Sequence, residues 1–81
     1  MVIFGYMKEI APGIIIDPNI QSGKPVIKGT RVPVEVIVGQ VAAGDPIEEV
    51  AQSYLITKND VLAALQFASR LVSNQRIRAV P

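Results

Sequence analysis

The sequence predicts a mainly α fold, in which a short N-terminal β-hairpin precedes a three-helix bundle that contains a helix-turn-helix. Between residues 22 and 34, two glycines and two prolines separate short β-branched runs, a pattern typical of strands and tight turns. After residue 33, apolar residues recur every three or four positions, as in amphipathic helices. The 81 residues are expected to form one domain (1–81), with the hairpin at 14–32, the bundle at 33–74 and a short tail at 75–81.

The predicted hairpin pairs the β-branched run Ile14–Ile16 with Val26–Ile27. Asp17 and Pro18 end the first strand, because proline lacks the N–H that a sheet requires and aspartate favours turns. Residues 1–13 form either an N-terminal extension or an added strand. In the hairpin alone, the strand at 14–16 leaves an edge that a second copy of the chain could pair.

The connection from the hairpin to the first helix is expected to depend on glycines and prolines. Gly23 and Gly29 supply turn conformations, while proline fixes its own φ and keeps the preceding residue extended. Arg31 either contacts DNA or ties the loop to carbonyl groups at a helix end. The residues predicted to shape this motif and the following helix are Gly23, Pro25, Gly29, Thr30, Arg31, Pro33 and Gly44.

The first helix is predicted at about 33–43, beginning at Pro33 and ending before Gly44, where a C-terminal glycine belongs. Its apolar residues follow the spacing of three and four that places them on one face.

A second, short helix is predicted to run to about Ser53. Asp45 is expected to cap it, with Pro46 in the first helical position. Glu48, three residues after the aspartate, is expected to complete a capping box.

The third helix is predicted to reach about Asn74, and residues 57–60 repeat the cap signature at its start. Phe67, at the edge of its apolar face, fits either the core or a dimer contact, and the dimer contact is the preferred interpretation. The opposite face is expected to meet solvent or a partner. The apolar face comprises Val61, Leu62, Leu65, Ala68 and Val72, and the opposite face comprises Asn59, Ala63, Gln66, Arg70 and Ser73.

The composition narrows the class of protein. The chain is 49% hydrophobic and 19% charged, and it contains neither cysteine nor histidine. Disulfides and the usual zinc ligands are therefore excluded. Because so much of the chain is apolar, a homodimer is expected to cover apolar surface that one small core cannot hide. No apolar run approaches the roughly 20 residues that span a bilayer, and the start of the chain lacks the pattern of a signal peptide. A cytoplasmic protein without membrane contact is expected.

An enzymatic function is not expected. Without histidine and cysteine, carboxylates, lysines and tyrosines are left as acids, bases or nucleophiles. Glu48 and Glu49 are adjacent, so on a helix they point roughly 100° apart and cannot act as a pair. Residues 23–28 lack the Gly-Lys-Ser/Thr string of a phosphate-binding loop. No catalytic residue, metal ligand or cofactor is predicted.

The second and third helices have the spacing of a helix-turn-helix. Ala51, Val61 and Leu65 stand where the elbow of that motif packs, and Leu55 is expected to fill its turn. DNA binding would place the third helix in the major groove, with the hairpin as a basic wing. The predicted DNA contacts are Lys58, Asn59, Gln66 and Arg70 on the helix, and Lys24, Lys28 and Arg31 in the hairpin.

An alternative of a different class stays open. Three-helix bundles that bind no DNA share the same spacing, and the net charge of +1 is small for a DNA-binding domain. The chain could then be a small homo-oligomeric interaction module in which the helix-turn-helix is only a scaffold.

The segment from Gly23 to Val34, GKPVIKGTRVPV, resembles the family known as domain of unknown function 433. The resemblance extends from about Ile14 to Leu71 and includes Ala43 and Gly44 as well as the Ile-Glu-Glu run at 47–49. It implies a homeodomain-like three-helix fold behind an N-terminal hairpin. It also implies a VapB-like antitoxin, which binds its own operator DNA and neutralises a PIN-like nuclease toxin.

Overall fold

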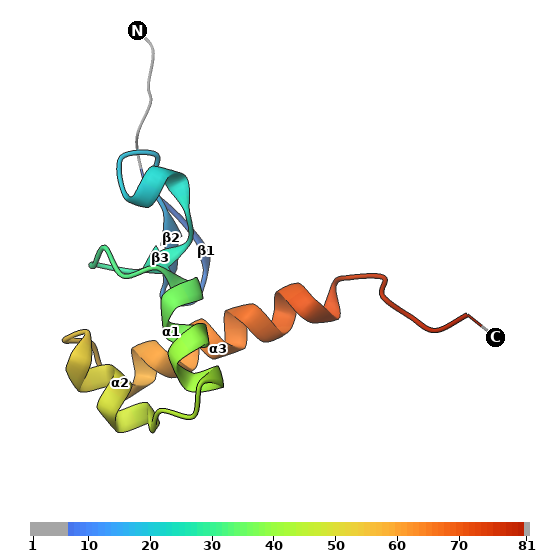
Figure 1. The fold of residues 1–81 in the computed structure, drawn as a ribbon. Helices are drawn as coiled ribbons and strands as arrows, with labels where there is room; N and C mark the ends of the chain where they lie inside the picture. Colours follow the sequence, from blue (N-terminus) through green and yellow to red (C-terminus); the bar gives the residue numbers. More distant parts are fainter. Residues whose placement is uncertain (1–6, 81) are drawn as a thin grey trace, which may run out of the picture.

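The computed structural model describes residues 7–80 and consists of three helices and a small antiparallel sheet (Figure 1). The prediction of a mainly α fold with an N-terminal β-hairpin is confirmed. The elements are β1 (Lys8–Ala11), β2 (Ile14–Ile16), a short 3-10 turn (Gln21–Gly23), β3 (Val26–Ile27), α1 (Val34–Ala42), α2 (Ile47–Ser53) and α3 (Lys58–Ser73). Within the described residues, no helix has the length and apolar character needed to cross a membrane.

The sheet has three strands in the order β1, β2, β3, and both pairings are antiparallel. Ile14 pairs with Ile27 and Ile15 with Val26, which confirms the predicted hairpin. Part of the segment at 1–13 is an added strand, β1, while residues 1–6 lie outside the described residues. Because β1 pairs with the outer side of β2, β2 is the central strand. The prediction that residues 14–16 leave a free edge is therefore wrong.

A tight turn joins β3 to the segment that enters α1. The backbone N–H of Thr30 donates to the carbonyl of Ile27 over 3.0 Å, and Gly29 inside this turn has φ +80°. The Thr30 hydroxyl donates to the same carbonyl over 2.8 Å and accepts the N–H of Val32 over 3.0 Å. The N–H of Ile27 donates to the carbonyl of Val32 over 2.9 Å, so the outer side of β3 is also paired.

Replacing Gly29 with valine is expected to cost about 1–3 kcal/mol of unfolding free energy, because a β-branched residue resists a positive φ. An added Cβ at Gly29 would meet no atom within 4 Å, so the cost comes from the backbone alone. Lys28→Ala is the control, since it removes one exposed ion pair worth about 0–1 kcal/mol. Thermal denaturation of both variants checks this, and equal melting temperatures would show that Gly29 tolerates a side chain.

The end of α1 agrees with the prediction, whereas the start of α2 does not. Helix α1 ends at Ala42, and Gly44 two residues later has φ +101°, the left-handed conformation of a helix C-terminus. Helix α2 starts one residue later than predicted, because Pro46 is extended and occupies the N-cap position without any side-chain cap. The capping box predicted for Asp45 and Glu48 is therefore wrong, and Glu48 instead forms an ion pair with α3.

Helix α3 begins with the predicted cap. The Thr57 hydroxyl accepts the backbone N–H of Asp60 over 3.0 Å, and the Asp60 carboxylate accepts the N–H of Thr57 over 2.9 Å. Both donors of this capping box are satisfied, which fixes the first turn of the helix and the direction in which it leaves α2.

The core lies where β2, β3 and the three helices meet. On α3 the buried residues are Val61, Ala64 and Phe67, whereas Val72 is 70% exposed because the end of the helix extends past the body (Figure 1). Phe67 is 9% exposed and packs in the core, so the core interpretation is confirmed, while the preferred dimer contact stays a prediction. The buried core residues are Ile14, Ile27, Val34, Ile37, Val50, Ala51, Val61, Ala64 and Phe67.

The turn between α2 and α3 is built differently from the prediction. Leu55 does not fill it: its side chain is 92% exposed, and its φ is +55°, a conformation that leucine adopts at a cost. The positive φ at Leu55 carries the chain away from α2, and the next residue, Ile56, packs against the core instead.

Candidate nucleic-acid interface

One face of α3 presents polar side chains to solvent. Asn59, Gln66 and Arg70 are all exposed, and their spacing of seven and four residues places them within roughly 40° of one another around the helix. Ala63, between them, is partly buried because the β1–β2 turn lies beside it: a Cβ added at Gly13 would be 3.4 Å from the Ala63 Cβ. The β1–β2 turn therefore packs on this face at Ala63, while the side chains of Asn59, Gln66 and Arg70 stay exposed.

Lys58, in the first turn of α3, forms an ion pair with α2. Its ammonium group lies 3.4 Å from the Glu48 carboxylate, and both side chains are exposed. The pKa of Glu48 lies below its ordinary value, first because its own backbone N–H stabilises the carboxylate and then because Lys58 does. The pair ties the first turn of α2 to the first turn of α3 and reduces the positive charge available there.

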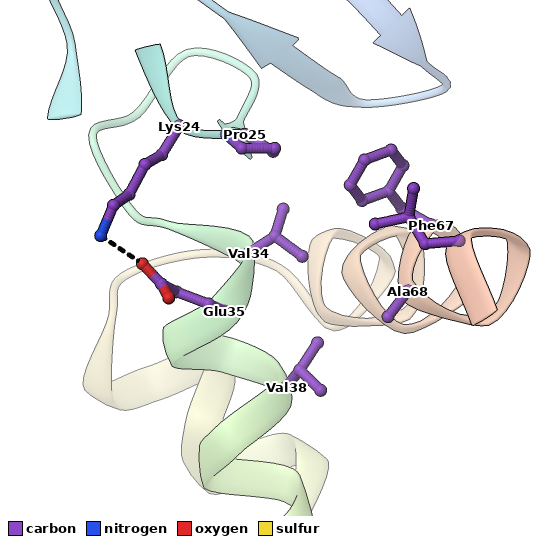
Figure 2. A pocket seen from close by; sticks show the side chains of 8 residues that line it. Lys24, Pro25, Val34, Glu35, Val38, Phe67 and Ala68 are labelled. Carbon is purple, nitrogen blue, oxygen red and sulfur yellow. Dashed lines mark hydrogen bonds and ion pairs between the residues drawn. The ribbon is translucent and has the colours of Figure 1, made fainter. Parts of the chain in front are cut away.

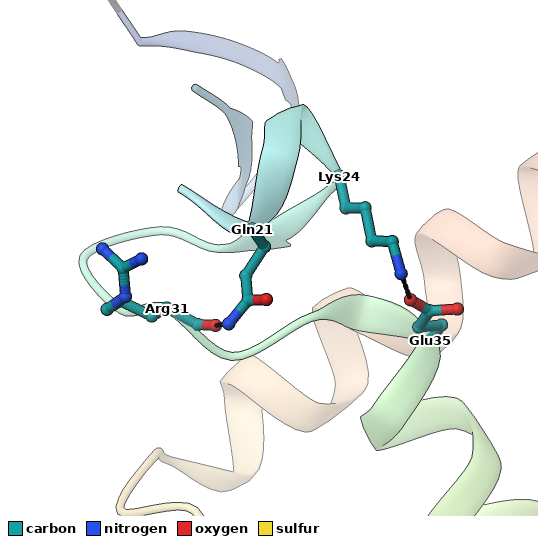
Figure 3. A network of polar contacts seen from close by, with 4 residues as sticks. All are labelled: Gln21, Lys24, Arg31 and Glu35. Carbon is teal, nitrogen blue, oxygen red and sulfur yellow. Dashed lines mark hydrogen bonds and ion pairs between the residues drawn. The ribbon is translucent and has the colours of Figure 1, made fainter. Parts of the chain in front are cut away.

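The hairpin cations are also paired with carboxylates. Lys24 lies 2.7 Å from Glu35 on α1 (Figure 3), and Lys28 lies 3.0 Å from Glu9 on β1. Both pairs are exposed, so each contributes little to stability and can open for another anion. The three lysines predicted to contact DNA thus each have an acidic neighbour.

Arg31 presents its side chain to solvent, away from α1 and Glu35 (Figure 3). Its carbonyl accepts the side-chain amide of Gln21 over 3.1 Å, which ties the 3-10 turn to the loop before α1. Among the described residues, no hydrogen bond or ion pair engages the guanidinium. The alternative in which this guanidinium binds carbonyls at a helix end is therefore not what the structure shows.

An apolar groove, which the sequence did not reveal, lies on another side of α3. Figure 2 shows Val34 and Val38 on α1 facing Phe67 and Ala68 on α3, with Pro25 beside them. The groove has a volume of about 370 Å³, and the Lys24–Glu35 ion pair lies at its rim. The sequence of α3 contains one sign of this groove. Leu71 follows Ala64 and Phe67 at helical spacing, so the apolar face of α3 continues past the core. The groove is lined by Lys24, Pro25, Val34, Glu35, Val38, Phe67, Ala68 and Leu71.

Part of the chain is similar in sequence to a known protein family. Residues 14–68 match the sequence model of a family described as protein of unknown function (DUF433). The chain belongs to the DUF433 family. The match runs from β2 into α3, so it includes the hairpin, α1, α2 and the part of α3 that carries Asn59 and Gln66.

A solved structure is similar to part of this DUF433 chain. The X-ray crystal structure of Rv2018 from Mycobacterium tuberculosis is 33% identical over the matched part, with a TM-score of 0.60. The match covers 64% of this chain and 24% of Rv2018, so the chain spans about a quarter of that protein. No curated protein matches the chain.

Glu9 joins β1 to two neighbouring segments in this DUF433 protein. Its carboxylate accepts the backbone N–H of Gly13 over 2.9 Å and the ammonium group of Lys28 over 3.0 Å. These contacts, the Gly13 N–H first, hold the pKa of Glu9 below its ordinary value of 4.5. The stabilisation is therefore present above pH 4.5 and is lost as the pH falls through the lowered pKa of the folded state.

Glu9→Gln is expected to lower the melting temperature near neutral pH, because glutamine cannot pair with the Lys28 ammonium group. The difference from the wild type should shrink as the pH falls through the lowered pKa of the folded state, below which Glu9 has lost its charge in both the folded and the unfolded chain. Melting curves at several pH values measure this, with Glu49→Gln, an exposed glutamate on α2, as the control. A difference that stays constant with pH would contradict the assigned role of the carboxylate.

Proposed function

We propose that this DUF433 protein is a DNA-binding transcriptional autoregulator with a homeodomain-like helix-turn-helix, in which α3 is the recognition helix. The observation that supports this most is the row of exposed polar side chains, Asn59, Gln66 and Arg70, along one face of a capped helix that follows a short turn after α2. Recognition helices of this motif use the same arrangement of donors on the face that enters the major groove.

The side chains suit the reading of base edges. Asn59 and Gln66 can each bind adenine bidentately in the major groove, and Arg70 can bind guanine or a phosphate. None of the three is occupied by a side-chain partner among the described residues. Arg31, on the loop before α1, is a further free cation for a phosphate.

An antitoxin role is part of the same proposal and rests on the family resemblance. A protein of this type would neutralise a PIN-like nuclease encoded beside it. This is tested by measuring whether the purified chain inhibits RNA cleavage by that nuclease when the two are mixed in equal amounts. Undiminished cleavage would remove the antitoxin role and leave the DNA-binding role to be judged separately.

A second function, a homo-oligomeric interaction module without DNA binding, is favoured by the ion pairs. Lys24, Lys28 and Lys58 each lie within 3.4 Å of a carboxylate, which lowers the positive potential that attracts phosphates. The choice between the two functions therefore depends on whether binding has sequence preference.

Fluorescence anisotropy over a series of salt concentrations tests the proposal, with DNA from upstream of the protein's own gene and a scrambled duplex. Tighter binding to the upstream DNA is expected, with an affinity that falls as salt rises. Arg70→Ala should make the slope of log affinity against log salt shallower by about 1, if Arg70 neutralises one phosphate. Equal binding of both duplexes at low salt would refute the regulator and favour the interaction module.

A further inference from the structure

We propose that the apolar groove between α1 and α3 is a homodimer interface, in which each copy receives the C-terminal segment of the other, residues 71–80. This segment comprises the last turn of α3 and the chain that follows it. The proposal concerns a different side of α3 from the polar face and does not depend on DNA binding.

The groove itself is built for apolar side chains. Its volume of about 370 Å³ falls in the range of about 300–1,000 Å³ that binding pockets occupy. Six of its eight lining residues are apolar, and the two charged ones, Lys24 and Glu35, are paired with each other at 2.7 Å. It therefore lacks the set of convergent polar groups that would orient a small polar ligand, whereas an apolar chain segment fits it.

The C-terminal segment carries the apolar surface that such a groove requires. Seven large apolar side chains are exposed within residues 7–80, and four of them lie in this segment. Leu71 is 49% exposed and Ile77 is 84% exposed, because the end of α3 projects from the body and the chain continues away from it (Figure 1). Exposed apolar surface of this kind is typical of a contact site. The four residues are Leu71, Val72, Ile77 and Val80.

The groove and the segment are complementary in the way that a two-fold axis requires. A symmetric interface must use the same patch on both copies. Leu71 meets this condition, since it lines the groove and also belongs to the exposed segment. An axis that passes close to Leu71 would bring each projecting end onto the groove of the other copy, where Phe67 and Val38 lie.

The charges of the C-terminal segment also favour a second copy of the chain as the occupant of the groove. Residues 70–80 contain three arginines and no acidic residue. Helix α1, which forms one wall of the groove, has Glu35 as its single charged residue, and that carboxylate is exposed at the rim. A second copy would thus bring Arg76 and Arg78, which flank Ile77, toward Glu35, where they would share the carboxylate with Lys24.

The dimer leaves the polar face of α3 open. Leu71 lies roughly 100° around the helix from Arg70, and roughly 120° from Asn59, so the two faces are separate. A dimer formed through the groove would therefore carry two polar faces to solvent, and its formation can be measured without DNA.

Sedimentation equilibrium of the full chain tests the proposal. The wild type is expected to show twice the mass of one chain at micromolar concentration. Leu71→Glu and Ile77→Glu should each weaken the dimer about tenfold or more, because each places a charge in an apolar contact. Leu55→Asn is the control: it changes a leucine that is 92% exposed in the turn before the other end of α3, and asparagine tolerates a positive φ. Circular dichroism checks that each variant is folded. If Leu71→Glu unfolds, Ile77→Glu decides, since Ile77 lies outside every helix and strand.

Cysteine cross-linking then identifies the surfaces, since the chain has no cysteine of its own. A mixture of Val38→Cys chains and Ile77→Cys chains should form a disulfide-linked heterodimer under mild oxidation, more readily than a mixture of Val38→Cys and Leu55→Cys. A monomeric wild type, a dimer that survives both glutamate variants, or a dimer lost in Leu55→Asn would overturn the proposal. So would a Val38→Cys/Ile77→Cys double variant that cross-links only within one chain.

Discussion

Ile37→Ala is expected to lower the free energy of unfolding by about 2–5 kcal/mol, the usual cost of removing a large aliphatic side chain from a core. Ile37 is completely buried on α1 and belongs to the cluster that joins the sheet to all three helices. A cavity at this position would weaken the contacts of α1 with both other helices. For a chain of this size the melting temperature should fall by about 10 °C or more, as measured by thermal denaturation followed by circular dichroism.

Ile77→Ala is the matched control for this prediction. It makes the same chemical change at a residue that is exposed beyond the end of α3, so it should leave the stability of the single chain unchanged. The comparison is made at a low protein concentration, at which association does not contribute. If Ile37→Ala melted within a few degrees of Ile77→Ala, the core would not be centred on α1.

The double variant Asn59→Ala/Gln66→Ala is expected to abolish preference for the upstream DNA while the fold is retained. Each lost bidentate contact to a base should cost about 1–3 kcal/mol of discrimination, so the pair would remove about 2–6 kcal/mol. Both side chains are exposed on α3, and neither contributes to the core or to the Thr57 cap, so folding should be unaffected. Anisotropy titrations on upstream and scrambled duplexes measure the change.

Gln52→Ala provides the control for the double variant, because Gln52 is also exposed but lies on α2. It should bind the two duplexes as the wild type does. A double variant that keeps the full preference of the wild type would exclude these two residues as base contacts and move recognition to the hairpin. A double variant that loses affinity for both duplexes equally would indicate that Asn59 and Gln66 bind the phosphate backbone.

The sequence predicted those parts of the fold that depend on short-range chemistry. The pairing of β2 with β3 followed from β-branched runs separated by turn residues, and the cap of α3 followed from Thr57 and Asp60, whose side chains reach each other within one turn. The same cap signature failed at Asp45. The pattern does not show whether the helix begins at Pro46 or after it, and a shift of one residue is enough to separate the side chain from its N–H partners.

The features that depend on tertiary position could not be predicted in this way. The helical period places Phe67 at the edge of the apolar face, and its burial depends on where α1 and β3 lie. The exposure of Leu55 depends on a left-handed backbone conformation that leucine rarely adopts, so its apolar side chain suggested the opposite. The ion pairs of the predicted DNA-binding lysines join residues 10 to 19 positions apart, beyond the reach of local patterns.

The central position of β2 also bears on how the protein avoids aggregation. On one side β2 is covered by β1, and the outer side of β3 is hydrogen-bonded to the segment that leads into α1, so β1 presents the exposed edge of the described sheet. That edge is four residues long, carries Lys8 and Glu9, and has an irregular register between Glu9 and Ala11. Short, charged and irregular edges resist the strand-by-strand growth from which amyloid forms. This chain, although rich in apolar residues, exposes large ones on the end of α3 and the segment after it. In the proposed dimer, association through that surface stops at two copies, whereas association along a strand edge would continue from copy to copy.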